Sequence, residues 1–339
     1  MLQNLAKSPL MAVFFASLLY FAGLFVPYSD EYLAASSEFA MPLLGYLFLL
    51  AFALWISLTF ALAFGAAEKK SLITAGLLFA SVLGSVWAIP NTEPLLFGPA
   101  PGKMGFWDTV FSSGRGAACT VIILVLAVLL FKTALYAKPE EEPEEKQPKK
   151  REEEPAEKPV YKLKIIELAI KVVVLPLIFC VLFFISWYFL HWTNSDVRAF
   201  YEGSPEVSGI IPAIVNVLLY DTWMLYMVLL EGLAYALFAL PLLFLFPGKR
   251  MIFVASLTLI YLGGALWGLI PTPFMPDNIR LSTSVYTAAL MLVFGVGAGF
   301  LLHTSFKKTA VEAVAEEPAP APAPKRRSRS AAAPAAERK

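Results

Sequence analysis

Hydrophobic residues in this chain are gathered into eight long runs, separated by segments that contain charge, Pro or Gly. The runs are continuous and lack the period-2 alternation of membrane β-strands. A bilayer core about 30 Å thick is crossed by about 20 helical residues, and a helix pairs its backbone polar groups internally. The sequence therefore predicts eight transmembrane helices, at about residues 9–27, 41–65, 71–89, 117–136, 168–190, 222–246, 251–270 and 284–303.

The composition supports this assignment. Of the 339 residues, 58% are hydrophobic and only 16% are charged, with a mean hydropathy of +0.67. A soluble domain of this size needs more charge on its surface. The predicted fold class is therefore an all-α, multi-pass membrane protein. The run from Leu10 to Val26 is longer than the apolar part of a usual signal peptide and no clean cleavage site follows it, so we expect a retained first helix.

The distribution of Lys and Arg predicts the orientation, because positive residues resist translocation. With the N-terminus in the cytoplasm, the cytoplasmic side holds all but four of the 27 Lys and Arg residues. The short turns at Lys69-Lys70 and Lys249-Arg250 agree independently with the long linker and tail. We therefore expect a protein of the inner (plasma) membrane with both termini in the cytoplasm. The four exceptions are Lys103, Arg115, Arg198 and Arg280.

Tryptophan gives a second indication, since its amphipathic ring prefers the headgroup region of a bilayer. Six of the seven tryptophans fall at the outer ends of the predicted spans or in the outer loops, and only Trp55 lies deep. We interpret them as an aromatic belt. The six are Trp87, Trp107, Trp187, Trp192, Trp223 and Trp267.

A short motif occurs twice, as LGSVWAIPNTEP from Leu83 and as LGGALWGLIPTP from Leu262. One offset of 180 residues aligns Trp87 with Trp267 and also aligns the basic cytoplasmic turns. Each half also carries Phe-Phe-x-Ser in its first span and Ser-Asp in the following loop. These matches predict a tandem duplication, with a four-helix unit at 1–138 and another at 165–308. Since four spans is an even number, the two units should have the same orientation, as in parallel-repeat transporters.

The two remaining segments are polar. Residues 139–164 mix runs of Glu and Lys with Pro and have no apolar periodicity, which is typical of a disordered linker. Residues 309–339 form a Pro-rich and Ala-rich tail, also predicted to be disordered. Its basic cluster could bind anionic lipid or an acidic partner, although a solvated tail that fixes topology is the simpler interpretation. The cluster comprises Lys325, Arg326, Arg327 and Arg329.

The sixth span contains the strongest candidate for chemistry within the membrane. Glu231 lies inside this span, and a carboxylate there is costly unless it faces protein or water. Asp221 falls near its outer end, Asn216 lies in an interfacial or re-entrant segment before it, and Tyr235 is one turn beyond Glu231. One interpretation is a proton or cation site on a transport pathway, and the simpler one is a hydrated carboxylate near the rim.

Other chemistry finds little support in the sequence. Cys119 and Cys180 lie inside predicted spans, and His191 and His303 fall on opposite sides of the bilayer, so we expect no disulfide, metal site or haem. We find no phosphate-binding loop or nucleophile motif, expect no cofactor and no nucleic acid, and regard an enzyme as the less favoured class. Two classes remain: a small-solute or ion transporter, and a non-catalytic scaffold or accessory subunit. The expected partners are the lipid bilayer and either other membrane proteins or further copies of this chain.

Overall fold

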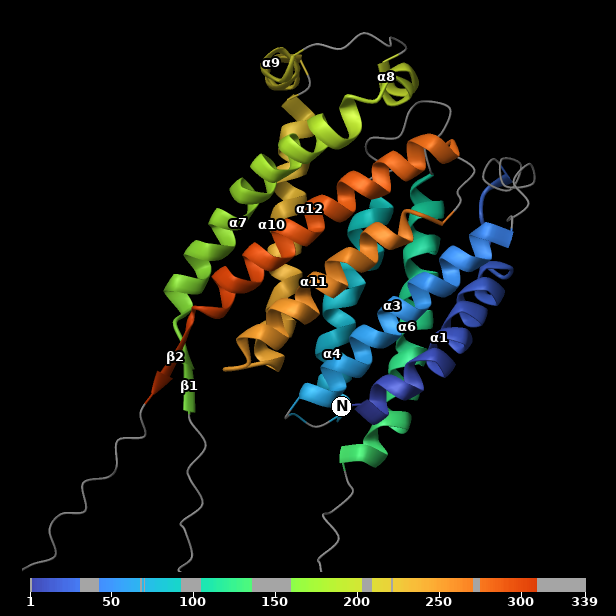
Figure 1. Cartoon of the computed structure of the whole chain (residues 1–339), viewed down its shortest axis with the longest axis vertical. Helices are drawn as coiled ribbons and strands as arrows, with labels where there is room; N and C mark the ends of the chain where they lie inside the picture. Colours follow the sequence, from blue (N-terminus) through green and yellow to red (C-terminus); the bar gives the residue numbers. More distant parts are fainter. Residues whose placement is uncertain are drawn as a thin grey trace, which may run out of the picture.

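The structure, a computed structural model of the chain, describes residues 2–30, 43–67, 69, 71–92, 105–135, 160–202, 209–220, 222–270 and 275–309. These residues form a bundle of long helices with a two-stranded antiparallel ribbon at one end (Figure 1). In chain order the elements are α1 (Leu2–Gly23), α3 (Leu43–Ala66), α4 (Ser71–Val82), the π-helix η1 (Leu83–Ala88), α6 (Phe106–Leu135), β1 (Val160–Leu163), α7 (Ile165–Ser186), the π-helix η3 (Trp187–Trp192), α8 (Ser195–Glu202), α9 (Ile210–Tyr220), α10 (Thr222–Leu245), α11 (Arg250–Trp267), α12 (Asp277–His303) and β2 (Phe306–Thr309).

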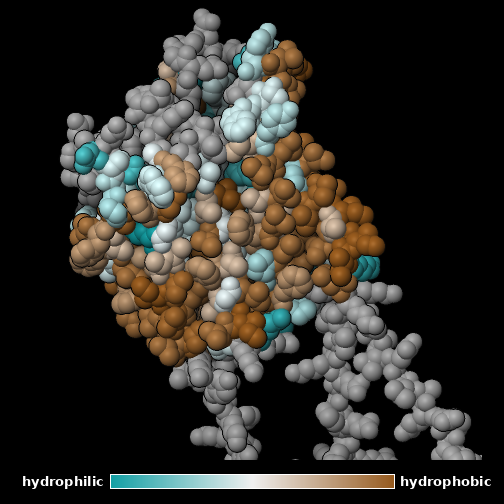
Figure 2. Space-filling model, turned by 180° about the vertical axis from the view of Figure 1, so that it is seen from behind, coloured by the Kyte–Doolittle hydropathy of each residue, from teal (hydrophilic) through white to brown (hydrophobic). Residues whose placement is uncertain are grey.

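Within the described residues, eight helices are long and apolar enough to cross a membrane, which confirms the number of spans predicted from the hydrophobic runs. Apolar side chains cover much of the face shown in Figure 2, as expected of a surface in contact with lipid. α1 begins, and α6 ends, at the end of the bundle where β1 and β2 lie (Figure 1). We call this the linker end, and the opposite end, where α8 and α9 lie, the loop end.

Two helices begin earlier than predicted at the loop end. α6 begins at Phe106 instead of residue 117, and α12 begins at Asp277 instead of residue 284. Hydropathy missed these turns because they contain Ser, Thr, Asn and Arg, all of which a helix tolerates at a polar rim. Each helix also has an aspartate in its first turn, Asp108 and Asp277, where a negative charge interacts favourably with the helix dipole.

The third span does not end before Pro90 as predicted. The helix widens into η1 at residues 83–88 and then continues to Thr92. In the wide turn the Ile89 N–H donates to the Gly84 carbonyl, five residues back. A proline inside an α-helix clashes with the preceding turn and lacks an N–H group, and the wider turn is the local change that accompanies Pro90 here.

The first four long helices lie on one side of the bundle and the last four on the other (Figure 1). α1 packs on α3 and α6, while α4 packs on α6. In the second half α7 packs on α10 and α12, while α11 packs on α12. The two halves meet through α3 against α11 and through α4 against α10, and we call this interface the seam.

Glycines allow the close approach of helices at the seam. A Cβ atom on Gly84 would lie 2.0 Å from the ring of Phe238, which belongs to α10. A Cβ atom on Gly264, the residue 180 positions later, would lie 2.9 Å from the Ser85 carbonyl oxygen and 3.2 Å from the ring of Pro90. A larger side chain at either position therefore requires its neighbours at the seam to move.

The predicted aromatic belt is wrong for three of its six tryptophans. Trp87 is fully buried, and Trp187 and Trp192 are buried as well. The Trp87 and Trp267 rings contact each other edge to face, with centroids 4.8 Å apart, and both pack on Phe52. The aligned tryptophans of the repeated motif thus meet at the seam. Trp107 and Trp223 remain exposed, as a belt requires.

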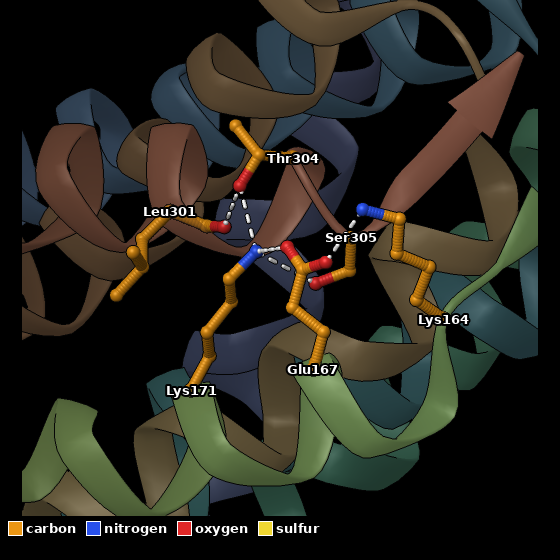
Figure 3. A network of polar contacts seen from close by, with 6 residues as sticks. All are labelled: Lys164, Glu167, Lys171, Leu301, Thr304 and Ser305. Atoms are coloured by element: carbon orange, nitrogen blue, oxygen red, sulfur yellow. Dashed lines mark hydrogen bonds and ion pairs between the residues drawn. The ribbon is translucent and has the colours of Figure 1, made fainter.

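At the linker end, a polar network joins the residues around the start of α7 to the residues that follow α12 (Figure 3). The Lys171 ammonium contacts the Glu167 carboxylate and donates to Thr304 Oγ1 at 2.7 Å and Ser305 Oγ at 3.1 Å. The Lys164 ammonium also binds Glu167, at 2.8 Å. The network ties the start of α7 to the end of α12.

The ribbon corrects one predicted boundary. Residues 160–163 were expected to belong to the disordered linker, but they form β1, which pairs with β2 in the register Val160↔Thr309 to Leu163↔Phe306. Leu163 also packs against the hydrophobic core, so the pattern Val-Tyr-Lys-Leu has enough apolar character to order a strand. The rest of the predicted linker, and the tail beyond Thr309, lie outside the described residues.

Candidate functional site

Glu231 lies in the first half of α10 and is half-buried. Val228 and Tyr235, one turn to either side, are both buried. Two turns further along the same helical face is Phe238, whose ring packs on Gly84. This face of α10 therefore points toward the third span of the first half, and Glu231 lies nearer the loop end than that contact.

Tyr235 belongs to an aromatic cluster of the second half. Its ring lies 5.6 Å from that of Phe179 and 5.0 Å from that of Tyr261, and the Tyr261 hydroxyl donates to the Tyr235 carbonyl oxygen at 2.6 Å. The side chain is thus held one turn from Glu231 by packing on α7 and α11.

The other predicted site residues are not brought to Glu231 in the described structure. Asn216 is exposed on α9, a short apolar helix that runs in a different direction from α10 (Figure 1). Asp221 lies outside the described residues, as do the four basic residues of the tail, Lys325, Arg326, Arg327 and Arg329.

A second group of polar residues, which the sequence analysis did not identify, surrounds Trp87 at the loop end of the first half. We call it the Trp87 cluster. It consists of Tyr28, Ser29, Trp87, Asn91, Asp108, Ser112, Ser113, Arg115 and Thr120.

The backbone around the π-helix organises this cluster. The Trp87 carbonyl oxygen accepts hydrogen bonds from Asn91 Nδ2 at 2.7 Å and from Ser113 Oγ at 3.2 Å. The indole Nε1–H of Trp87 donates to Thr120 Oγ1 at 2.9 Å. Because the ring is buried, this bond satisfies its only polar atom. η1 is thereby fixed to α6 by side-chain hydrogen bonds on both sides of Trp87.

The carboxylate of Asp108 is occupied by Ser29. Its two oxygens accept from the Ser29 N–H at 2.8 Å and from the Ser29 hydroxyl at 2.7 Å. These bonds hold the segment after α1 against the start of α6. Burial raises the pKa of the neighbouring Tyr28 phenol, while the Arg115 guanidinium acts in the opposite direction.

Arg115 connects the cluster to the other half. Its guanidinium carbon lies 5.9 Å from the centroid of a Trp267 ring, within the range of a cation–π contact. A Cβ atom on Gly23 would lie 2.7 Å from Arg115 Nη1. The guanidinium therefore rests between the end of α1 and the end of α11.

The second half has its own polar contacts at the loop end. Asn278 Nδ2 donates to Asp196 Oδ2 at 2.8 Å, which joins the Ser-Asp segment after η3 to the start of α12. His191 Nδ1 and Ser282 Oγ lie 3.0 Å apart. In both halves, the Ser-Asp motif is thus bonded to the first turns of the fourth long helix.

Helical spacing is the signal that could have identified the Trp87 cluster. Asp108, Ser112 and Arg115 are spaced four and three residues apart, so they lie on one face of a helix. The hydrophobic run predicts a span that begins only at residue 117, which leaves residues 106–116 in a loop, where this spacing carries no information.

Metal or redox chemistry gains no support from the described part of the chain. It contains no group of three or more His, Cys, Asp or Glu side chains that could hold a metal ion. Cys119 and Cys180 are free thiols on different helices.

Comparison with protein families, with curated proteins and with solved structures found no match for this chain.

Proposed function

We propose that this protein is a membrane transporter for a small solute or ion, and that Glu231 binds a proton or cation on its pathway. The observation that carries the proposal is a half-buried carboxylate within a span, on the side of α10 that faces the seam. Inserting a charged side chain at the centre of a transmembrane helix costs about 2.5–3.5 kcal/mol, and ionisable residues within spans are typical of ion pathways.

The proposal includes two four-helix units of the same orientation, at 1–138 and 165–308. They are joined by a linker that ends at residue 159, before β1, and are followed by a tail that starts at residue 310, after β2. The four long helices α1, α3, α4 and α6 correspond in order to α7, α10, α11 and α12, and the contacts within one half recur in the other. Under this correspondence, the seam contact of α3 with α11 becomes that of α10 with α4. Contact between Trp87 and Trp267 is expected near a two-fold axis. These features support a transporter built from parallel repeats.

We place the linker end in the cytoplasm of a plasma (inner) membrane, on the basis of the Lys and Arg bias. Two single-cysteine variants, made in a chain without Cys119 and Cys180, test this placement. Lys249→Cys should resist a membrane-impermeant maleimide added to intact cells, and Asn278→Cys should react. The reverse labelling pattern would contradict the orientation.

Replacing Glu231 with Gln should reduce transport at least tenfold, because the amide keeps the shape of the carboxyl group but cannot exchange a proton or hold a cation. Proton movement is followed with an internal pH dye in proteoliposomes, under an imposed potential, while amino acids, sugars, carboxylates, Na⁺ and K⁺ are added class by class.

Glu167→Gln, which changes a carboxylate at the linker end, is the matched control and should keep the wild-type flux. Equal fluxes in Glu231→Gln and the wild type would contradict the role of Glu231.

A scaffold or accessory subunit is the second candidate. α9 favours it, because this short helix exposes large apolar side chains, with Ile211 73% and Tyr220 82% accessible. The flux assay separates the two functions, since a scaffold moves none of the solutes.

A further inference from the structure

The three arginines described at the loop end differ in their partners. Arg280 is buried and forms an ion pair with Asp277 at 2.7 Å. Arg198 is buried and donates from Nη1 to the Trp192 carbonyl oxygen at 2.5 Å. Arg115, by contrast, forms neither a hydrogen bond nor an ion pair with any part of the chain that the structure describes, and its Nε is buried without an acceptor.

The described neighbours of Arg115 hold the guanidinium in place, and none of them is a carboxylate paired with it. The guanidinium carbon lies over the Trp267 ring, and the Gly23 backbone lies next to Nη1. The nearest carboxylate along the helix is Asp108, two turns away, and both of its oxygens already accept from Ser29. Ser113, which could offer a polar group, donates to the Trp87 carbonyl.

A half-buried arginine without an acceptor is costly, because the buried part of the charge has lost water and gained no partner. The cost is recovered when an external acceptor binds. A guanidinium presents a planar fork of N–H donors that matches the two oxygens of a carboxylate or phosphate. Arg115 is only partly buried, so part of this side chain remains accessible.

We infer that Arg115 binds an oxyanion, a carboxylate or phosphate group, in a site formed by the end of α1, α6 and the end of α11. The ligand is the anionic group of a small solute or of a lipid headgroup. The site combines residues of both halves, since Gly23 and Arg115 come from the first and Trp267 from the second. It does not depend on Glu231 or on transport.

Binding is measured on the purified full-length protein. The free-solute arm titrates sodium phosphate and sodium succinate against sodium chloride of equal ionic strength, with thermal unfolding and tryptophan fluorescence as readouts. The lipid arm compares nanodiscs of phosphatidylglycerol with nanodiscs of phosphatidylcholine and measures the retained lipid by native mass spectrometry. We expect saturable binding in at least one arm, with affinity reduced tenfold or more in Arg115→Gln.

Two further variants keep the test independent of folding defects. Gly23→Ala retains the Arg115 charge and displaces only Nη1, the end of a flexible side chain. This variant should fold like the wild type but bind the oxyanion more weakly. Arg250→Gln removes a charge at the linker end and should bind like the wild type. Binding of phosphate or succinate indicates a solute, and selective retention of phosphatidylglycerol indicates a lipid. Absence of saturable binding in both arms, or unchanged affinity in Arg115→Gln and Gly23→Ala, would overturn the inference.

Discussion

Replacing Gly84 with alanine should destabilise the protein by about 1–3 kcal/mol, the usual cost of forcing an extra carbon into a packed interior. The new Cβ would lie 2.0–2.3 Å from three ring carbons of Phe238, far inside van der Waals contact. Phe238 lies at the seam, so either its ring must turn away or η1 and α10 must separate. Unfolding followed by circular dichroism in detergent should show a lower midpoint.

Two other glycines serve as controls. Gly76 lies on the same helix with no atom within 4 Å of its added Cβ, so Gly76→Ala should be neutral or stabilising, as alanine is the better helix former. Gly264→Ala should cost about as much as Gly84→Ala, because its Cβ meets the Ser85 carbonyl and Pro90. Equal midpoints for the Gly84 and Gly76 variants would show that the seam is not tightly packed, and a harmless Gly264→Ala would count against equivalent halves.

Replacing Trp87 with alanine should have the largest effect, with a loss of about 3–5 kcal/mol as for other large-to-small changes in protein interiors. The ring is fully buried, packs on Phe52 and Trp267, and covers Gly116, where a Cβ would lie 2.3 Å from it. The variant also loses the hydrogen bond to Thr120. The stability of Trp87→Phe should lie between that of the wild type and that of Trp87→Ala, since phenylalanine keeps part of the ring contact but loses the indole N–H.

The matched control is Trp107→Ala. Trp107 is 66% exposed at the start of α6, so its loss should change the unfolding midpoint little. The belt interpretation, in which all these tryptophans are equivalent lipid anchors, predicts similar losses for Trp87 and Trp107. Similar midpoints for the two alanine variants would therefore favour the belt and count against a buried role for Trp87.

The sequence predicted the eight spans because their apolar runs are continuous and as long as a bilayer is thick. It misplaced the ends where local packing decides. Pro90 should stop a helix, yet the wide turn of η1 lets the helix continue to Thr92. Residues 106–116 are too polar for a hydropathy window, yet their hydrogen bonds to η1 and to Ser29 hold them in the helix.

The candidate sites also differ in whether the sequence alone can identify them. Glu231 was identifiable because an isolated carboxylate in an apolar run is conspicuous without any structure. The Trp87 cluster was not, because a tryptophan at a span end suits either the headgroup region or the protein interior, and only tertiary contacts decide between them. In the sequence, Arg115 is merely one of the four basic residues that fall outside the predicted cytoplasmic segments. That the described residues offer it no acceptor can be known only when its neighbours are placed.

The pairing of β1 with β2 has a consequence for anything that binds the two charged segments. Val160 and Thr309 are partners in the ribbon, so the segment ending at residue 159 and the segment starting at residue 310 are attached at neighbouring points. A ligand that engages one segment is thereby presented to the other at high local concentration, because the second encounter no longer requires diffusion through the bulk solution. Two weak attachments can then hold as firmly as a single strong one.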